Sequence, residues 1–202
     1  MGGRPCLVVG GGPVAARKAG GLLACGALVT VIAPAVCAAM AALTPLAITR
    51  REYAPGDAAG YRLVLTATGI TAVDGAVYAD AEAAGVWVNS ADDVEHCTFI
   101  LPSVHRDGPV SVAVSTGGAS PALAGWLRAR LAESGGPGLG ELADLLGLAR
   151  QRLHDAGRST ERVDWAALLD GPLPALVRAG EHRAARSLVE EATGMNLTSA
   201  PE

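Results

Sequence analysis

The sequence contains few aromatic residues: they make up 3% of its 202 positions, although half of the residues are apolar. The core must therefore be built from alanine, valine, leucine and isoleucine. Lys18 is the only lysine among 16 basic residues, and the net charge is -4. A chain without a basic excess offers no electrostatic reason to bind nucleic acid or an anionic membrane surface.

Long apolar runs are also missing. No segment reaches the ~18 uninterrupted apolar residues that a membrane-spanning helix needs, and no N-terminal stretch has the pattern of a signal peptide. The four cysteines, Cys6, Cys25, Cys37 and Cys97, contain no Cys-x-x-Cys pair, and two of them fall in apolar stretches. We therefore expect buried, reduced thiols in a cytoplasmic protein.

The first 110 residues alternate short apolar runs with helical patterns, which is typical of an α/β fold. A strand at 6–9, a helix at 13–23 and a second strand at 27–32 make one βαβ unit. Further predicted elements are strands at 46–49, 61–68, 86–89, 99–102 and 110–115, the last with an antiparallel alternation, and a helix at 74–84.

The remainder of the chain is predicted to be helical. Ser120-Pro121 is a good helix start, with an N-cap residue followed by proline at the first helical position. A glycine-rich linker at 135–138 ends that helix region. Apolar residues then recur at helical spacing over 139–154, 165–169 and 174–192, before a frayed tail at 198–202.

A dinucleotide fingerprint stands between the first strand and the first helix. Gly10-x-Gly12-x-x-Ala15 gives a tight turn, a close backbone approach to a pyrophosphate and close contact between helix and strand. The helix N-terminus adds free N–H groups and partial positive charge. The strand–turn–helix–strand context favours cofactor binding over a glycine turn that serves helix and strand contact alone.

The acidic residue that usually holds the ribose is missing, because Ile32-Ala33-Pro34 ends the second strand and no Asp or Glu precedes Glu52. The ribose must be held by backbone groups or by nothing specific, so these residues do not exclude NADP. We assign cofactor binding to Gly10, Gly12, Pro13, Val14, Ala33, Pro34, Ala35, Thr66 and Thr68.

A second group of chemically active residues, at 89–97, follows a strand whose carboxyl end should face the ligand crevice. It contains three carboxylates, the imidazole of His96 and the thiol of Cys97. One interpretation is an acid/base carboxylate, Asp92 or Asp93, beside the nicotinamide. A metal site of Asp, His and Cys is another. A solvated acidic loop that caps a turn is the third.

A third segment, Ser115 to Pro121, is a polar, glycine-rich turn between a strand and a helix N-terminus. Such a turn can bind an anion such as a carboxylate, and it can equally be an ordinary strand-to-helix connection.

At these three segments together, the chain resembles the precorrin-2 dehydrogenase family of siroheme biosynthesis, some of whose members are also sirohydrochlorin ferrochelatases. The resemblance covers about residues 4–130 and is specific because the motifs occur in order; His96 and Thr98 depart from the residue types expected there. The matching pieces are residues 7–18, 89–93 with Cys97, 99–103 and 112–121.

The resemblance implies an α/β fold with an NAD-binding Rossmann domain at 1–109, a dimerisation region at 110–136 and a helical C-terminal domain at 137–202, assembled as a homodimer. The implied reaction oxidises precorrin-2 to sirohydrochlorin with NAD. Asp92 would be the general base, and in bifunctional members would also assist insertion of ferrous iron, without a permanent metal site. The implied substrate contacts are Asn89, Ser115, Thr116, Gly117 and Gly118.

The chemistry is compatible with these residues. The macrocycle must lose a hydride to the nicotinamide and a proton to a base, so one carboxylate near the cofactor is the minimum requirement. The macrocycle carries many carboxylates, which positively charged side chains can bind. The candidates are Arg17, Lys18, Arg106 and Arg128. The alternatives are a non-catalytic NAD-sensing module that signals through its helical domain and an NAD(P) oxidoreductase for another small substrate.

Overall fold

The computed structural model describes residues 1–136 and 138–197; the tail expected at 198–202 lies outside the described residues. The chain divides into two compact units, Met1–Leu101 and Pro102–Glu202. The three-part division at 109 and 136 stays a prediction.

The first unit is built on a parallel sheet of five strands in the order β3-β2-β1-β4-β5. The chain runs outward from β1 to β3 on one side and then crosses back to add β4 and β5 on the other, which is a doubly wound arrangement, as the α/β pattern predicts. The strand bounds are β1 Pro5–Val9, β2 Leu28–Ile32, β3 Ala47–Thr49, β4 Leu63–Thr66 and β5 Trp87–Ser90.

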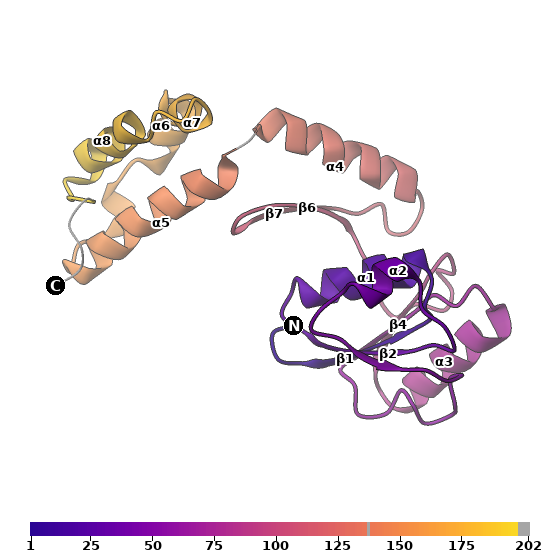
Figure 1. The fold of residues 1–202 in the computed structure, drawn as a ribbon. Coiled ribbons are helices and arrows are strands. Elements are labelled where there is room, and N and C mark those ends of the chain that lie inside the picture. The colour runs from indigo at the N-terminus through magenta and orange to yellow at the C-terminus, as the bar shows by residue number, and fades with distance from the viewer. Residues whose placement is uncertain (137, 198–202) are drawn as a thin grey trace. The chain divides into compact units, whose positions relative to one another are not determined.

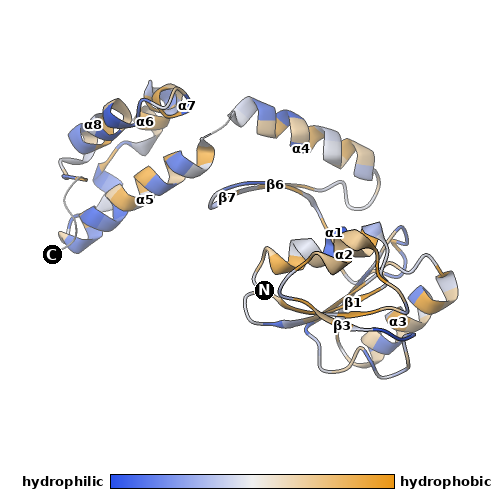
Figure 2. Ribbon diagram, viewed as in Figure 1, coloured by the Kyte–Doolittle hydropathy of each residue, from blue (hydrophilic) through white to orange (hydrophobic). Residues whose placement is uncertain are grey.

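Helices cover both faces of this sheet (Figure 1). Alternate strand residues point to opposite faces, so Val8 and Leu65 contact α1 (Pro13–Leu23) and α2 (Ala38–Ala41), whereas Val9 and Val64 contact α3 (Thr71–Ala83). Both faces of the central strands are buried, which explains why β1 is almost continuously apolar in Figure 2. The short helix α2 was not expected from the sequence.

The second unit begins with an antiparallel hairpin of β6 (Ser103–Asp107) and β7 (Val110–Val114), which contacts helix α4 (Pro121–Gly135). The strand predicted at 99–102 is wrong, because the chain there covers the edge of β5 and the next strand starts at Ser103. Ser120 caps α4 as expected, its hydroxyl accepting from the Leu123 N–H at 3.2 Å.

Within residues 138–197, four α-helices and one 3-10 helix, η1, follow. Their buried leucines, valines and alanines form a separate core. The long helix expected at 174–192 is two helices, because Gly180 adopts a left-handed φ of 73° between them. The bounds are α5 Leu139–Asp155, η1 Thr160–Arg162, α6 Trp165–Asp170, α7 Leu173–Arg178 and α8 His182–Thr193.

All four cysteines are reduced, as expected, but they are not all buried. Cys6 lies in the core of the sheet, whereas Cys25 is exposed at the end of α1 and Cys37 and Cys97 are half-buried. Within residues 1–136 and 138–197, none of the helices combines the length and the apolar character of a transmembrane segment.

Leu173→Ala tests the core of the helical region, because the Leu173 side chain is 0% exposed. We expect the free energy of unfolding to fall by about 2–5 kcal/mol, the usual effect of removing a fully buried leucine. Leu169→Ala is the matched control, since Leu169 on the neighbouring helix is 43% exposed and should change stability by no more than about 0.5 kcal/mol. Urea unfolding followed by circular dichroism measures both; equal losses would contradict this assignment of the core.

Candidate functional site

The glycine turn after β1 is wedged between two other segments at the carboxyl edge of the sheet. Gly10 has a φ of 118°, and a Cβ placed on it would lie 2.5 Å from the Ala67 carbonyl oxygen. A Cβ on Gly11 would lie 1.9 Å from the Ala35 carbonyl oxygen. The first two glycines are therefore required by contacts within the protein itself.

Gly12 differs from its neighbours because a Cβ on it would meet nothing within 4 Å. Gly12 is the N-cap of α1, with Pro13 next, no side-chain cap and no acidic residue in the first turn. The open space therefore lies where backbone N–H groups and the helix dipole favour a phosphate. This arrangement fits a dinucleotide pyrophosphate beside Gly12, Pro13 and Val14, as the fingerprint predicts.

The segment expected to face the ribose lies directly against the turn. The Cys37 N–H donates to the Gly11 carbonyl oxygen at 2.8 Å, and the Ala35 carbonyl oxygen touches Gly11. Ala33 is buried, while Pro34 and Ala35 are exposed. This position suits recognition by backbone groups.

The carboxyl end of β4 lies on the other side of the glycine turn, with Thr66 as its last residue and Thr68 just beyond it. The Thr66 side chain is fully buried and its hydroxyl donates to Asp74, so it has no free surface for a cofactor. The Thr68 N–H also donates to Asp74, at 3.2 Å, and Thr68 is only partly buried. The sequence did not single out Asp74. The feature that could have indicated it is its position as the acidic residue in the first turn of α3.

Asn89 is the last residue but one of β5, and its side chain links three parts of the first unit. Its side-chain oxygen accepts from the Lys18 ammonium at 2.7 Å, and its side-chain nitrogen donates to the Phe99 carbonyl oxygen at 3.0 Å. Asn89 is 5% exposed, so its amide has little surface left for a substrate. Lys18 is likewise engaged inside the protein rather than free for a substrate carboxylate.

The Cys97 thiol closes the loop that follows β5. It accepts from the Ser90 N–H at 3.2 Å and lies 3.1 Å from the Asp93 carbonyl oxygen, to which it donates. Burial raises the pKa of Cys97, which keeps it a thiol able to donate. The Ser90 hydroxyl at the same edge is buried and, among the described residues, without a partner, so a ligand or water there would stabilise it.

Asp92 stands at the tip of this closed loop. Among the residues described, it is the only non-glycine residue with a left-handed backbone, φ 61°, and its exposed carboxylate has no hydrogen-bond partner there. The neighbouring Asp93 is instead paired with the His96 ring at 2.6 Å, which lowers the pKa of Asp93. Of the two aspartates, Asp92 is therefore the one whose carboxylate is unpaired.

The metal interpretation of this loop has no geometric support. In the described part of the chain, no three His, Cys, Asp or Glu side chains gather closely enough to hold a metal ion. His96 instead pairs with Asp93 and meets the ring of Tyr78 edge-on, with centroids 4.9 Å apart.

The glycine-rich turn in the second unit uses its side chains internally. The Thr116 hydroxyl accepts from the Ser120 N–H, and the Ser115 hydroxyl accepts from the Gly117 N–H. Gly117 and Gly118 have φ values of 63° and 89°, which explains both glycines. An ordinary strand-to-helix connection accounts for these bonds, and anion binding here stays a prediction.

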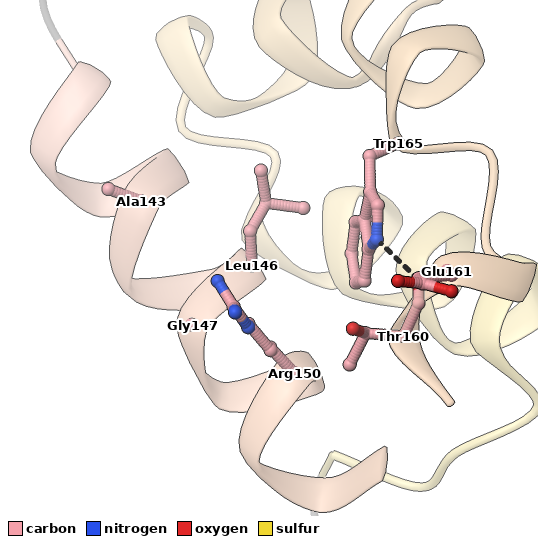
Figure 3. Close-up of a pocket in the computed structure, with 7 residues that line it drawn as sticks. All are labelled: Ala143, Leu146, Gly147, Arg150, Thr160, Glu161 and Trp165. Carbon is pink, nitrogen blue, oxygen red and sulfur yellow. Dashed lines mark hydrogen bonds between the residues drawn. The ribbon is translucent and has the colours of Figure 1, made fainter. Parts of the chain in front are cut away.

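An open cavity of about 480 Å³ lies in the helical region, between α5, η1 and α6 (Figure 3). The Trp165 ring forms one wall, and its Nε1–H donates to the Thr160 carbonyl oxygen at 2.9 Å. Leu146 and Arg150 come from the facing helix. None of the residues that the sequence assigns to cofactor or substrate lines this cavity.

Two family models match the chain. One, described as "Putative NAD(P)-binding", matches residues 1–103, which is the unit that holds the glycine turn and Asp92. The other, described as "Sirohaem biosynthesis protein central", matches residues 107–134, which includes most of the hairpin and α4. The expected resemblance is confirmed.

Individual relatives support the same family. The siroheme synthase of Nitrosomonas eutropha is 37% identical over 98% of this chain, and that of Methylococcus capsulatus is 40% identical over 93%. This chain spans 43% and 41% of their lengths. A solved structure described as a precorrin-2 dehydrogenase matches with a TM-score of 0.72 and 27% identity, covering 95% of this chain and 96% of its own.

Gly11→Ala should destabilise the protein by about 1–3 kcal/mol, because the new Cβ collides with the backbone carbonyl of Ala35 and the turn must move. Chemical denaturation of the purified variant measures the loss. An unchanged free energy of unfolding would show that the contact between the two loops is looser than described.

Gly12→Ala should behave in the opposite way. Its Cβ meets no protein atom, so stability should change by less than about 1 kcal/mol, yet it occupies the space where a pyrophosphate would approach. We expect NAD affinity to fall at least about tenfold, or 1.4 kcal/mol, by isothermal titration calorimetry. Undiminished affinity would place the dinucleotide elsewhere.

Proposed function

Because the chain belongs to the family of putative NAD(P)-binding proteins, and its relatives include siroheme synthases, we propose that it oxidises precorrin-2 to sirohydrochlorin with NAD. The observation that carries this proposal is Asp92, an exposed carboxylate without a hydrogen-bond partner in residues 1–136 and 138–197, held at the same sheet edge as the glycine turn. An unpaired base beside a dinucleotide site is the equipment that the oxidation requires.

The reaction removes a hydride and a proton from the macrocycle, and its products are sirohydrochlorin, NADH and a proton. Bound NAD supplies the hydride acceptor. Asp92 accepts the proton at a carboxylate oxygen and passes it to solvent, to which the loop tip is open. When NAD is bound, the Gly12 backbone and the N-terminus of α1 would hold the pyrophosphate, and backbone groups around Ala35 would contact the ribose.

Recognition of the substrate carboxylates falls to arginines, of which Arg17 and Arg106 are exposed and Arg128 is partly buried. Arg17 lies on α1 in the first unit, whereas Arg106 and Arg128 lie on β6 and α4 in the second. Ser115 to Gly118 remain the proposed substrate turn. Insertion of ferrous iron into the product is a further activity of the same carboxylate and stays a prediction, as does a cytoplasmic location.

We also propose a homodimer formed through the second unit. Helix α4 leaves large apolar side chains exposed: Leu123 at 47%, Trp126 at 59% and Leu131 at 49%. Their spacing places them on one side of the helix, and a second copy of that surface would bury them.

Asp92→Asn is the sharpest test of the proposed base, because asparagine tolerates the left-handed backbone and removes only the charge. We expect NAD-dependent formation of sirohydrochlorin, followed by absorbance, to fall by about 10²–10⁴-fold. Affinity for NAD should be unchanged, since no contact to the dinucleotide is lost.

The control is Glu95→Gln, which removes one negative charge from an exposed position of the same loop and should keep the wild-type rate. If the wild-type protein binds NAD but produces neither sirohydrochlorin nor NADH, the proposed activity is wrong. That outcome would favour an NAD-sensing module or an oxidoreductase with another substrate.

Trp126→Glu should convert the proposed dimer to a monomer, because a carboxylate would be buried in an apolar interface. Light scattering coupled to size exclusion measures the mass. The control Leu148→Glu changes a residue on α5 that is 38% exposed and should leave the mass unaltered. A monomeric wild-type protein would refute the dimer.

A further inference from the structure

Lys18, the only lysine of the chain, sits in the middle of helix α1. Side chains on a helix tilt toward its N-terminus, so that of Lys18 reaches back toward the carboxyl edge of the sheet. It is half-buried, and its ammonium donates to the Asn89 side-chain oxygen. A helix that begins at the glycine turn is thereby tied to the strand that leads to Asp92.

The register of the sheet explains why Asn89 receives this bond. Asn89 pairs with Leu65 of β4, and Leu65 belongs to the cluster of residues packed under α1. Asn89 therefore lies on the α1 face of the sheet. The other β5 side chain on that face is the exposed Trp87 ring. Burying an amide among apolar side chains destabilises the fold unless both ends are hydrogen-bonded, and both are.

Asn89 passes this constraint to the loop. Its side-chain nitrogen contacts the Cys97 sulfur at 3.3 Å as well as the Phe99 carbonyl. The Cys97 sulfur in turn holds the Ser90 N–H and the Asp93 carbonyl, which flank Asp92 on both sides. Every link between the Lys18 ammonium and the Asp92 backbone is thus a hydrogen bond or a covalent bond.

Charge supports the same connection. Burial lowers the pKa of Lys18, the neighbouring Cys97 and the negative charge of Asp92 oppose that effect, and Arg17 adds to it. Asp92 is thus close enough to attract the ammonium through space, although no ion pair joins them. A lysine held by an uncharged amide keeps its positive charge beside the base without neutralising it by contact.

We propose that Lys18 is a positioning residue, which ties the dinucleotide-binding helix to the loop of Asp92 and so fixes the base relative to the cofactor helix. This inference rests on the proposed role of Asp92. It also assigns Lys18 and Asn89 a role different from direct contact with the substrate.

A spectroscopic test uses the fact that the chain has a single lysine. Protein expressed with ¹³C-lysine and a lysine-free tag gives one ε-methylene signal, whose shift against pH reports the protonation of Lys18 alone. The pKa of Lys18 should lie below that of a free lysine, and Asp92→Asn should lower it further, because a negative charge that raises it is removed. Glu95→Gln should leave the signal in place, whereas Asn89→Leu should shift it.

A kinetic test separates positioning from simple stability. Lys18→Met keeps the length of the side chain and removes the donor; we expect kcat for precorrin-2 oxidation to fall about 10–100-fold, with KM for NAD changed less than about threefold. Lys18→Arg retains a donor and should recover a large part of kcat. Arg62→Met removes a cation from the opposite edge of the sheet and is the matched control.

The outcomes distinguish this inference from the proposed function. A wild-type protein that binds NAD but leaves precorrin-2 unchanged overturns the proposed function, while the lysine signal still judges the connection from Lys18 to Asp92. If the titration of the Lys18 signal is the same in Asp92→Asn and in Asn89→Leu as in the wild-type protein, the inference is overturned, even if Lys18→Met fails to fold. A folded Lys18→Met variant with wild-type kcat overturns it as well.

Discussion

The close approach of the glycine turn to the backbone on either side of it governs the first unit. With Gly10 against Ala67 and Gly11 against Ala35, the segments that leave β1, β2 and β4 meet without side chains between them. That contact fixes where α1 begins, and hence where Gly12 opens to solvent. A single methyl group at Gly11 would separate two backbones that now touch, and the helix start would move with them.

The parallel register carries this constraint to the second loop. In a sheet buried on both faces, neighbouring residues of one strand face different helices, so Asn89 turns toward α1 and Ser90 toward α3. The strand end therefore supplies one polar group to each side. The group on the α1 side meets Lys18, and the backbone that continues from it leads to Asp92.

The order of elements in the first unit was predictable because its strands are short, apolar and bounded by glycine. The edge of β5 was not: residues 99–102 have the composition of a strand, yet Phe99 accepts a side-chain hydrogen bond from Asn89 instead of joining a sheet. Helix α2 was missed because a helix of four residues is too short to show a periodic pattern. The break at Gly180 was missed because a glycine within a helical pattern does not by itself indicate a positive φ.

The candidate site was predictable where backbone geometry alone is required and less so where side chains choose partners. The fingerprint identifies Gly10 and Gly12 by spacing: Gly10 is required by the close approach of the Ala67 backbone, whereas Gly12 leaves open space beside the helix N-terminus. Nothing in the sequence shows that Lys18 contacts Asn89 across 71 positions, or that the Thr66 hydroxyl is used by Asp74. Such pairs depend on strand register, which a single sequence does not reveal.

The backbone of Asp92 bears on the choice between an enzyme and a sensor. A left-handed residue other than glycine is less stable by about 1–2 kcal/mol, and here the bonds of Cys97 and Asp93 hold it in place. Glycine would relieve this strain without disturbing those bonds. A module that only binds NAD has no use for an exposed, unpaired carboxylate at that tip, whereas a base must have one. The strain therefore supports the proposed proton transfer over binding alone.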